Sequence, residues 1–296
     1  MTDPSSIVEG TVTAGGLRFG TLSAGTDGPL ALCLHGFPDS AWTWRHLLPE
    51  LAAAGYRAVA PFLRGYAPTE IPADGLYQPG AIAADAIALH EALGGDGDAV
   101  LIGHDWGALA SYGAAGHAPD RWRRVVTAAV MPPAAIASDF LAYDQLRLSW
   151  YMFFFQSPLA ESIVAADDLA FIDRLWADWS PGFDGGEPIA RCKDALRDPA
   201  NLSAAIAYYR ATLGDGPRRE DLDAIEAAGM GPSQHPHLYL HGADDGCMGA
   251  HLLTDAVRAA FPQPGSQVLE VDGCGHFLHL ERPDHINRLI VDFLTA

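Results

Sequence analysis

The sequence predicts an α/β fold built on a mostly parallel sheet, and two alternating patterns carry this prediction. Short, nearly continuous apolar runs indicate strands buried on both faces, and they lie at residues 30–36, 57–63, 99–103, 125–131, 237–241 and 268–271. Longer segments with apolar residues three and four apart indicate helices between most of these runs, at residues 41–54, 80–93 and 106–117. Strands that alternate with helices form a parallel sheet covered by helices on both faces.

Two departures from this alternation complete the expected architecture. Residues 10–24 alternate polar and apolar side chains, which predicts an antiparallel hairpin at one edge of the sheet. Residues 133–232 lack clear strands and contain the aromatic clusters SWYMFFFQ and AYYRA, and the strand–helix rhythm resumes at His237. We therefore expect a core domain of residues 1–132 and 233–296, with residues 133–232 forming a helical cap.

Composition excludes several classes of protein. The chain has 296 residues, of which 49% are hydrophobic, and its 18 Lys and Arg against 37 Asp and Glu give a net charge of −19. Such a chain is too apolar for disorder, and its charge disfavours nucleic acid and anionic membranes. We find neither a secretory signal pattern nor an apolar run long enough to span a membrane. Four scattered cysteines without CxxC spacing suit reduced thiols, so we expect a cytoplasmic protein without a metal site.

The segment Gly103-His104-Asp105-Trp106-Gly107 is the most informative motif, because it joins a predicted strand to a predicted helix. Small residues two positions before and after Asp105 are typical of a nucleophile elbow, a sharp turn that lifts one side chain above the sheet. The alternative is that Asp105 merely caps the following helix, which aspartate does well.

Three further segments favour catalysis. His35-Gly36-Phe37 ends an early strand, so the backbone N–H groups of Phe37 and Trp106 are candidates for an oxyanion hole. A late strand ends in the acid pair Asp244-Asp245, and His276 follows the last strand on a glycine-rich loop. The resulting order is nucleophile, acid, histidine.

These motifs resemble the α/β-hydrolase superfamily along nearly the whole chain, and most of all its epoxide hydrolase branch. The resemblance rests on HGFPDS (35–40), RGYAPTEIP (64–72), GHDWG (103–107), HGADD (241–245) and GHFLHLERP (275–283). It implies an eight-stranded sheet with a helical cap after the sixth strand. The family spacing Gly-x-x-Asp selects Asp245 over Asp244 as the acid, and His276 is preferred over its neighbour His279 as the base.

The resemblance also implies two cap tyrosines that stabilise the oxygen of an opening epoxide. The matching residues are Tyr151, upstream of Phe-Gln-Ser-Pro, and Tyr209, in a Tyr-Arg step. Tyr208 is the alternative for the second role and Tyr143 a weaker one for the first. Both tyrosines could instead be ordinary core residues of the cap.

The implied activity is hydrolysis of a hydrophobic epoxide to a vicinal diol, without a cofactor. Asp105 would form an alkyl ester, and a water activated by His276 would hydrolyse it. The aromatic residues Trp106, Phe37, Trp150 and Phe154 are expected to contact this substrate. A homo-oligomer is compatible with the sequence.

Two alternatives remain open from the sequence. A haloalkane dehalogenase uses the same three catalytic groups, with the Trp106 indole and a cap tryptophan as halide donors, although Phe37 occupies the place of its usual Asn. A non-catalytic ligand receptor on a hydrolase scaffold is the second alternative. An ordinary esterase would need Ser or Cys at position 105.

Overall fold

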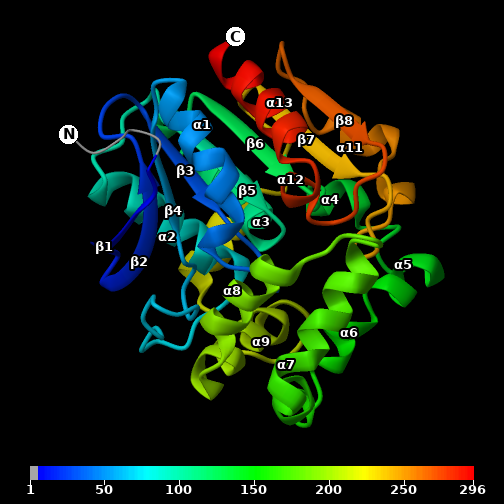
Figure 1. Cartoon of the computed structure of the whole chain (residues 1–296). Helices are drawn as coiled ribbons and strands as arrows, with labels where there is room; N and C mark the ends of the chain where they lie inside the picture. Colours follow the sequence, from blue (N-terminus) through cyan, green and yellow to red (C-terminus); the bar gives the residue numbers. More distant parts are fainter. Residues whose placement is uncertain (1–5) are drawn as a thin grey trace.

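The computed structural model describes residues 6–296 and contains one eight-stranded sheet with the order β1-β2-β4-β3-β5-β6-β7-β8 (Figure 1). The strands are β1 (Val8–Ala14), β2 (Leu17–Ala24), β3 (Leu30–Leu34), β4 (Arg57–Pro61), β5 (Val100–His104), β6 (Arg124–Ala128), β7 (His237–Gly242) and β8 (Gln267–Val271). β2 pairs antiparallel with β1 and β4, and the remaining pairs are parallel. The predicted parallel sheet and edge hairpin are therefore confirmed.

Helices cover both faces of this sheet, which explains why β3, β5 and β7 are buried along their whole length. α1 (Leu47–Ala53) packs with α13 (Pro283–Thr295) on one face, and α2 (Pro79–Ala92) packs with α3 (Trp106–His117) on the other (Figure 1). Shorter elements complete the core: η1 (Ala41–His46), η2 (Pro119–Arg121), η3 (Ala250–Leu252), α11 (Asp255–Ala259) and α12 (Leu278–Glu281).

The segment between β6 and β7 is helical, as the loss of strand periodicity predicts. It contains α4 (Pro133–Ile136), α5 (Tyr143–Leu148), α6 (Trp150–Phe154), α7 (Ala160–Trp179), α8 (Gly186–Leu196), α9 (Pro199–Leu213) and α10 (Glu220–Ala228). β6 ends at Ala128, earlier than the apolar run suggests, because Ala129 has a φ of 68° and turns the chain out of the sheet. The layer from α5 to α9 lies below the sheet in Figure 1.

The last helix of this segment, α10, packs against the core helices α2 and α3. The contact is so close that a Cβ at Gly80 of α2 would lie 1.9 Å from the carbonyl oxygen of Leu222 of α10. A glycine is required at that contact because any larger residue would overlap the backbone of α10. Within the predicted cap of residues 133–232, α10 therefore packs with the core; the exact domain boundaries stay a prediction.

Side chains tie the cap to loops at the carboxyl ends of the strands. The Tyr208 hydroxyl on α9 donates to the carbonyl of Arg64 at 2.8 Å, and the buried Arg64 guanidinium pairs with Asp85 at 2.6 Å. Trp176 on α7 donates its indole N–H to the carbonyl of Pro38 at 2.8 Å and stacks on Phe277 at 3.5 Å. The cap therefore covers the edge of the sheet where α/β proteins place their active sites.

Across residues 6–296, no helix combines the length and the apolar character that crossing a bilayer requires. The four cysteines, all in this described part, are buried free thiols.

Candidate active site

Asp105 occupies a strained turn between β5 and α3. Its φ of 53° and ψ of −117° are costly for a residue with a side chain. A Cβ at Gly103 would lie 2.2 Å from the carbonyl oxygen of Gly107, and a Cβ at Gly107 would lie 2.2 Å from that of Leu34. The turn therefore needs glycine at both flanking positions, as the motif predicts. The Asp105 side chain makes no capping hydrogen bond to the described backbone of α3, which argues against a simple helix cap.

The two oxygens of the Asp105 carboxylate have different surroundings. Oδ1 accepts a hydrogen bond from the backbone N–H of Phe37 at 2.7 Å. Oδ2 lies 3.6 Å from Nε2 of His276. A Cβ at Gly36 would lie 2.2 Å from Oδ1, so glycine there lets the loop approach the carboxylate. The second predicted donor, the backbone N–H of Trp106, forms no hydrogen bond with this carboxylate in the described chain.

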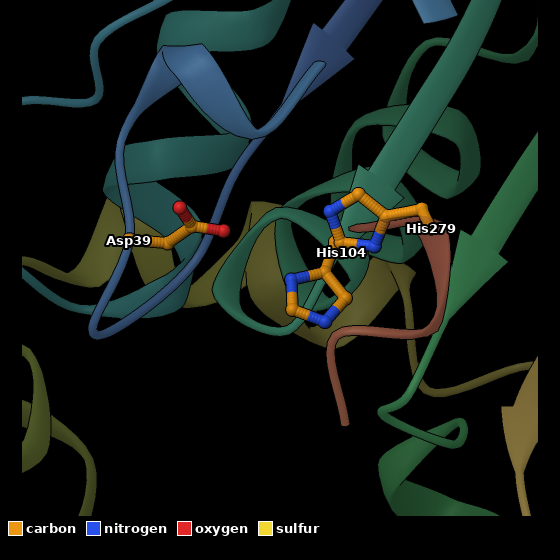
Figure 2. A group of neighbouring side chains, drawn as sticks. All are labelled: Asp39, His104 and His279. Carbon is orange, nitrogen blue, oxygen red and sulfur yellow. The ribbon is translucent and has the colours of Figure 1, made fainter. Parts of the chain in front are cut away.

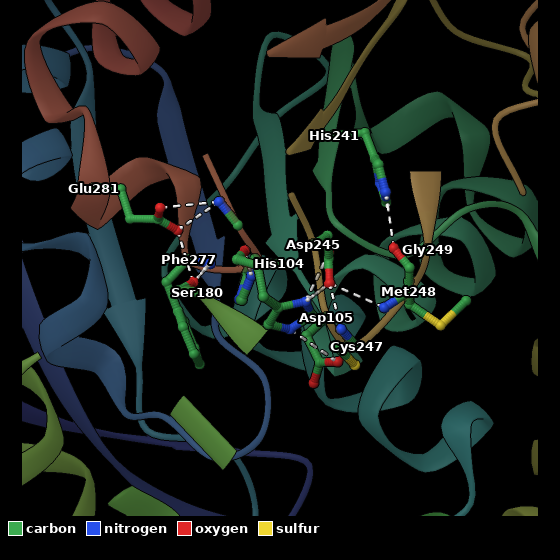
Figure 3. Close-up of polar contacts among 12 residues, drawn as sticks. His104, Asp105, Ser180, His241, Asp245, Cys247, Met248, Gly249, Phe277 and Glu281 are labelled. Carbon is green, nitrogen blue, oxygen red and sulfur yellow. Dashed lines mark hydrogen bonds and ion pairs between the residues drawn. The ribbon is translucent and has the colours of Figure 1, made fainter. Parts of the chain in front are cut away.

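His276 joins Asp105 to a second carboxylate, that of Asp245, and Figure 3 labels both acids. Its Nδ1 lies 3.0 and 3.2 Å from the two oxygens of Asp245, whose side chain is fully buried. Oδ1 of Asp245 also accepts hydrogen bonds from the backbone N–H groups of Cys247 at 2.7 Å and Met248 at 2.9 Å. Asp244 is exposed, so the geometry favours Asp245 as the acid partner. The predicted nucleophile, base and acid therefore lie in one line of contacts.

Charges in this line stabilise one another. Burial raises the pKa of Asp105, but the nearby His276 outweighs this effect and holds that pKa below its usual value. Burial alone would lower the pKa of His276, whereas the negative charges of Asp245 and Asp105 raise it well above the ordinary value. The resting site thus favours a charged Asp105 beside a protonated His276.

The loop that carries His276 is held by three consecutive backbone N–H groups. Gly275 donates to both oxygens of Glu281 at 3.0 and 2.9 Å, and His276 donates to the carbonyl of Trp179 at 2.9 Å. Phe277 donates to Oγ of Ser180 at 3.0 Å, and that hydroxyl donates to Glu281 at 2.7 Å (Figure 3). Trp179 and Ser180 end cap helix α7, so the cap itself helps to position the base.

Asp39, His104 and His279 form a second buried polar group, which Figure 2 shows. His104 Nε2 lies 2.9 Å from the carbonyl oxygen of His276 and donates to it, and His279 Nε2 lies 2.5 Å from Oγ1 of Thr43. Burial lowers the pKa of His104 to about 3 and raises the pKa of Asp39 to about 7. His279 belongs to this group rather than to the Asp105 contacts, which favours His276 as the base.

Two sets of side chains present three potential metal ligands within 4.8 Å of one another. One set is Asp39, His104 and His279, and the other is Asp105, Cys247 and His276. Sequence spacing gives no hint of either set, because the members come from distant segments. The absence of a metal site stays a prediction from the sequence.

The two predicted tyrosines both face a cavity that contains Asp105. The rings of Tyr151 and Tyr209 lie 5.5 Å apart, edge to face. Burial raises the pKa of both phenols well above 10, so each hydroxyl keeps its proton. The Tyr151 hydroxyl lies 3.3 Å from Sγ of Cys247, whereas the Tyr209 hydroxyl has no partner among residues 6–296.

The two alternative tyrosines lie elsewhere. Tyr208 turns its hydroxyl to the core loop at Arg64, and Tyr143 is 75% exposed. Of these four tyrosines, Tyr151 and Tyr209 line the cavity, whereas Tyr143 and Tyr208 do not.

The cavity has a volume of about 240 Å³ and a mostly apolar lining. Besides Trp106, it is lined by four methionines that sequence reasoning missed: Met131, Met152, Met230 and Met248. They are all the methionines of the chain apart from Met1. Flexible, polarisable methionine side chains adapt to ligands of different shape.

Three of the four predicted substrate contacts lie outside the lining of this cavity. Trp150 is 45% exposed and packs on Phe154, with ring centroids 6.0 Å apart, and neither belongs to the lining within the described chain. The two residues are four positions apart on α6 and share its outer face, while Tyr151 and Phe155 share the inner face. Phe37 also lies outside the lining, but its ring packs on Tyr209 at 5.3 Å.

Several known proteins are similar to this chain along most of its length. A family model described as the alpha/beta hydrolase fold matches residues 29–283. An epoxide hydrolase of Caballeronia sordidicola is 31% identical, covering 91% of this chain and 88% of the relative. Epoxide hydrolase 3 of Siraitia grosvenorii is 36% identical, covering 96% and 97% of the two chains. The solved epoxide hydrolase from an endophytic Streptomyces is 30% identical, with a TM-score of 0.77 and coverage of 97% and 95%.

Replacing Glu281 tests the support of the His276 loop. Glu281→Ala removes a charged acceptor of three hydrogen bonds, so we expect the free energy of unfolding to fall by about 2 to 4 kcal/mol. Glu270→Ala, at an exposed position of β8, should change it by less than about 0.5 kcal/mol. Urea denaturation measures both values. Equal effects of the two variants would contradict a supporting role for Glu281.

Proposed function

The chain belongs to the α/β hydrolase fold family, in its epoxide hydrolase-like branch, and we propose that it converts a hydrophobic epoxide to a vicinal diol. One observation carries this proposal. The carboxylate of Asp105 and the phenols of Tyr151 and Tyr209 line the same mostly apolar cavity. An epoxide needs a nucleophile at carbon and an acid at oxygen, and this arrangement supplies both.

The first step is attack of Oδ2 of Asp105 on one ring carbon. A carbon–oxygen bond of the ring breaks as the ester bond forms, and its electron pair passes to the epoxide oxygen. The hydroxyls of Tyr209 and Tyr151 donate hydrogen bonds to that oxygen, and one of them gives it a proton. Because burial keeps both phenols protonated, they act as donors throughout the neutral pH range.

The second step hydrolyses the ester. Nε2 of His276 takes a proton from water, and the resulting hydroxide attacks the Asp105 carboxyl carbon. The negative charge on Oδ1 is held by the backbone N–H of Phe37, which already binds this oxygen in the free site. The intermediate collapses by breaking the bond to Oδ2, and His276 returns its proton to the leaving diol. The Asp105 carboxylic acid that remains then passes its proton to His276. The phenolate left by the first step takes up the proton that His276 released when the ester formed. The new carboxylate oxygen of Asp105 comes from water.

Ester formation itself prepares His276 for the second step. In the free site, the negative charges of Asp245 and Asp105 favour protonated His276. The ester removes the Asp105 charge, so the pKa of His276 falls and its Nε2 becomes available as a base. Asp245 remains charged and keeps the imidazole oriented.

The site supports the two alternatives, a haloalkane dehalogenase and a non-catalytic receptor, less well. A dehalogenase needs donors for a halide leaving group, and none of the cap tryptophans Trp150, Trp176 and Trp179 lines the cavity within the described chain. Two phenols beside the nucleophile suit an oxygen leaving group instead. A non-catalytic receptor would not need the contacts from Asp105 through His276 to Asp245.

Product analysis tests the proposed activity directly. We expect diol from a panel of aryl and alkyl epoxides, and a loss of at least about 10⁴-fold in Asp105→Ala. His276→Gln should form the ester without hydrolysing it, which intact-mass analysis detects as one added epoxide mass on Asp105. Halide release from haloalkanes without diol formation would identify a dehalogenase. Binding without either product would favour a receptor.

Neighbouring tyrosines provide a matched pair of variants. Tyr209→Phe removes a hydroxyl that faces Asp105, so we expect kcat to fall at least about 100-fold. Tyr208→Phe removes a hydrogen bond to the core and should cost about 1 kcal/mol of stability, with kcat within about threefold of wild type. Steady-state kinetics and thermal unfolding separate the two effects. The assignment of Tyr209 fails if both variants lose kcat equally.

The two steps should respond differently to acid. The pKa of Asp105 is depressed, so alkylation persists as pH falls, whereas hydrolysis stops once His276 in the ester form is protonated. We therefore expect the fraction of esterified enzyme to rise toward low pH while kcat declines. Rapid quenching followed by intact-mass analysis measures this fraction. A fraction that decreases in acid would contradict the assigned roles.

A further inference from the structure

The catalytic centre contains a thiol that the proposed mechanism does not use. Cys247 lines the cavity, and its Sγ, a ring nitrogen of His276 and a carboxylate oxygen of Asp105 all lie within 4.8 Å of one another. His276 is fully buried, and its Nε2 forms no hydrogen bond of ordinary length in the part of the chain that the structure describes. The three atoms therefore converge on one point at the base of the cavity.

We propose that this centre is also a binding site for Zn²⁺, which Asp105, Cys247 and His276 hold as a reversible inhibitor. The Cys247 thiol and the protonated Nε2 of His276 each release a proton to solvent, so that the two residues bind as thiolate and neutral imidazole. The fourth coordination position faces the cavity and takes water. The binding site itself follows from geometry, whereas the inhibition rests on the proposed function.

The ligand types favour zinc over harder cations. Zinc commonly binds thiolate, imidazole and carboxylate together, while Mg²⁺ and Ca²⁺ prefer oxygen ligands alone. Zinc–ligand bonds of about 2.0 to 2.3 Å in a tetrahedron place the ligand atoms about 3.3 to 3.8 Å apart. Nε2 of His276 and Oδ2 of Asp105 already lie 3.6 Å apart. A small rotation of the Cys247 side chain completes the site.

The surroundings of His276 match a zinc ligand. Zinc-binding histidines usually donate their other ring N–H to a carboxylate, which fixes the ring and raises its basicity. Here Nδ1 faces Asp245 at 3.0 Å, leaving Nε2 toward the centre. The Tyr151 hydroxyl, 3.3 Å from Sγ, can donate to the bound thiolate. The contacts that orient the base for catalysis therefore also orient it for metal binding.

The second set of potential ligands, around His104, lacks this access. Asp39, His104 and His279 are buried and lie outside the cavity lining among the described residues. Metal arriving through the cavity meets the Asp105 set first, and binding there takes up lone pairs of both the nucleophile and the base. Inhibition should therefore compete with the epoxide.

Binding is measured first without reference to activity. The full-length protein is titrated with Zn²⁺ in competition with a chromophoric chelator, and with Co²⁺ to observe thiolate-to-cobalt charge-transfer absorption. We expect one site per chain, with the absorption band lost in Cys247→Val and zinc affinity reduced at least about 100-fold. Cys274→Ala, which removes another buried thiol near His276, serves as the control and should bind as wild type does.

Inhibition is then measured with an epoxide, each variant being compared with its own metal-free rate. We expect zinc to raise the apparent KM of wild type and Cys274→Ala, full recovery with EDTA, and at least about a 100-fold weaker effect on Cys247→Val. If the wild-type protein turns over epoxide but shows neither zinc binding nor a cobalt–thiolate band, the zinc site is refuted and the proposed epoxide hydrolysis stands. Zinc binding through Cys247 without epoxide turnover would support the site and refute the proposed function.

Discussion

The strained turn at Asp105 is the constraint on which the rest of the site depends. A side chain held at a φ of 53° persists only where its surroundings leave no alternative. Here the backbone of Gly107 approaches the carbonyl of Leu34, and Gly36 approaches the carboxylate itself. Gly36, Gly103 and Gly107 thus let β3, β5 and α3 pack closely around Asp105. The turn directs one Asp105 oxygen to the N–H of Phe37 and the other to His276.

The helices between β6 and β7 fix the geometry of the candidate site as well as lining its cavity. Among them, α7 ends at Trp179, whose carbonyl accepts hydrogen bonds from the backbone N–H groups of both Gly246 and His276. The same residue therefore fixes the loop of the acid and the loop of the base. A cap that swung away from the core would break these bonds, so the catalytic geometry requires a docked cap. We therefore expect substrate to reach Asp105 through the apolar cavity rather than by opening of the whole cap.

Much of this molecule could be predicted from the sequence because its signals are local. Buried strands, the glycine-flanked turn at Asp105 and the loop at His276 each depend on a few adjacent residues. The faces of α6 could not be predicted, since the segment Trp150–Phe155 is apolar on every side and offers no polar face to set the helical phase. The methionine lining, Cys247 and the packing of α10 depend on contacts between distant segments, and no spacing rule reveals them.

Charge balance explains why so many backbone N–H groups surround this site. Two buried carboxylates, Asp105 and Asp245, share one histidine, so the resting centre carries a net negative charge away from water. Burying such a charge is costly unless hydrogen bonds replace the lost hydration. The N–H groups of Phe37, Cys247 and Met248 supply that replacement.

In the proposed mechanism, the same excess negative charge favours formation of the Asp105 ester. An uncharged electrophile that esterifies Asp105 removes one buried charge and frees the histidine to act as a base. Hydrolysis then restores the original charge, and the fixed N–H groups hold it without rearrangement. A divalent cation would neutralise the same excess by a different route. The proposed reaction with an epoxide and the proposed binding of zinc therefore depend on one physical feature, a buried negative charge that only one histidine offsets.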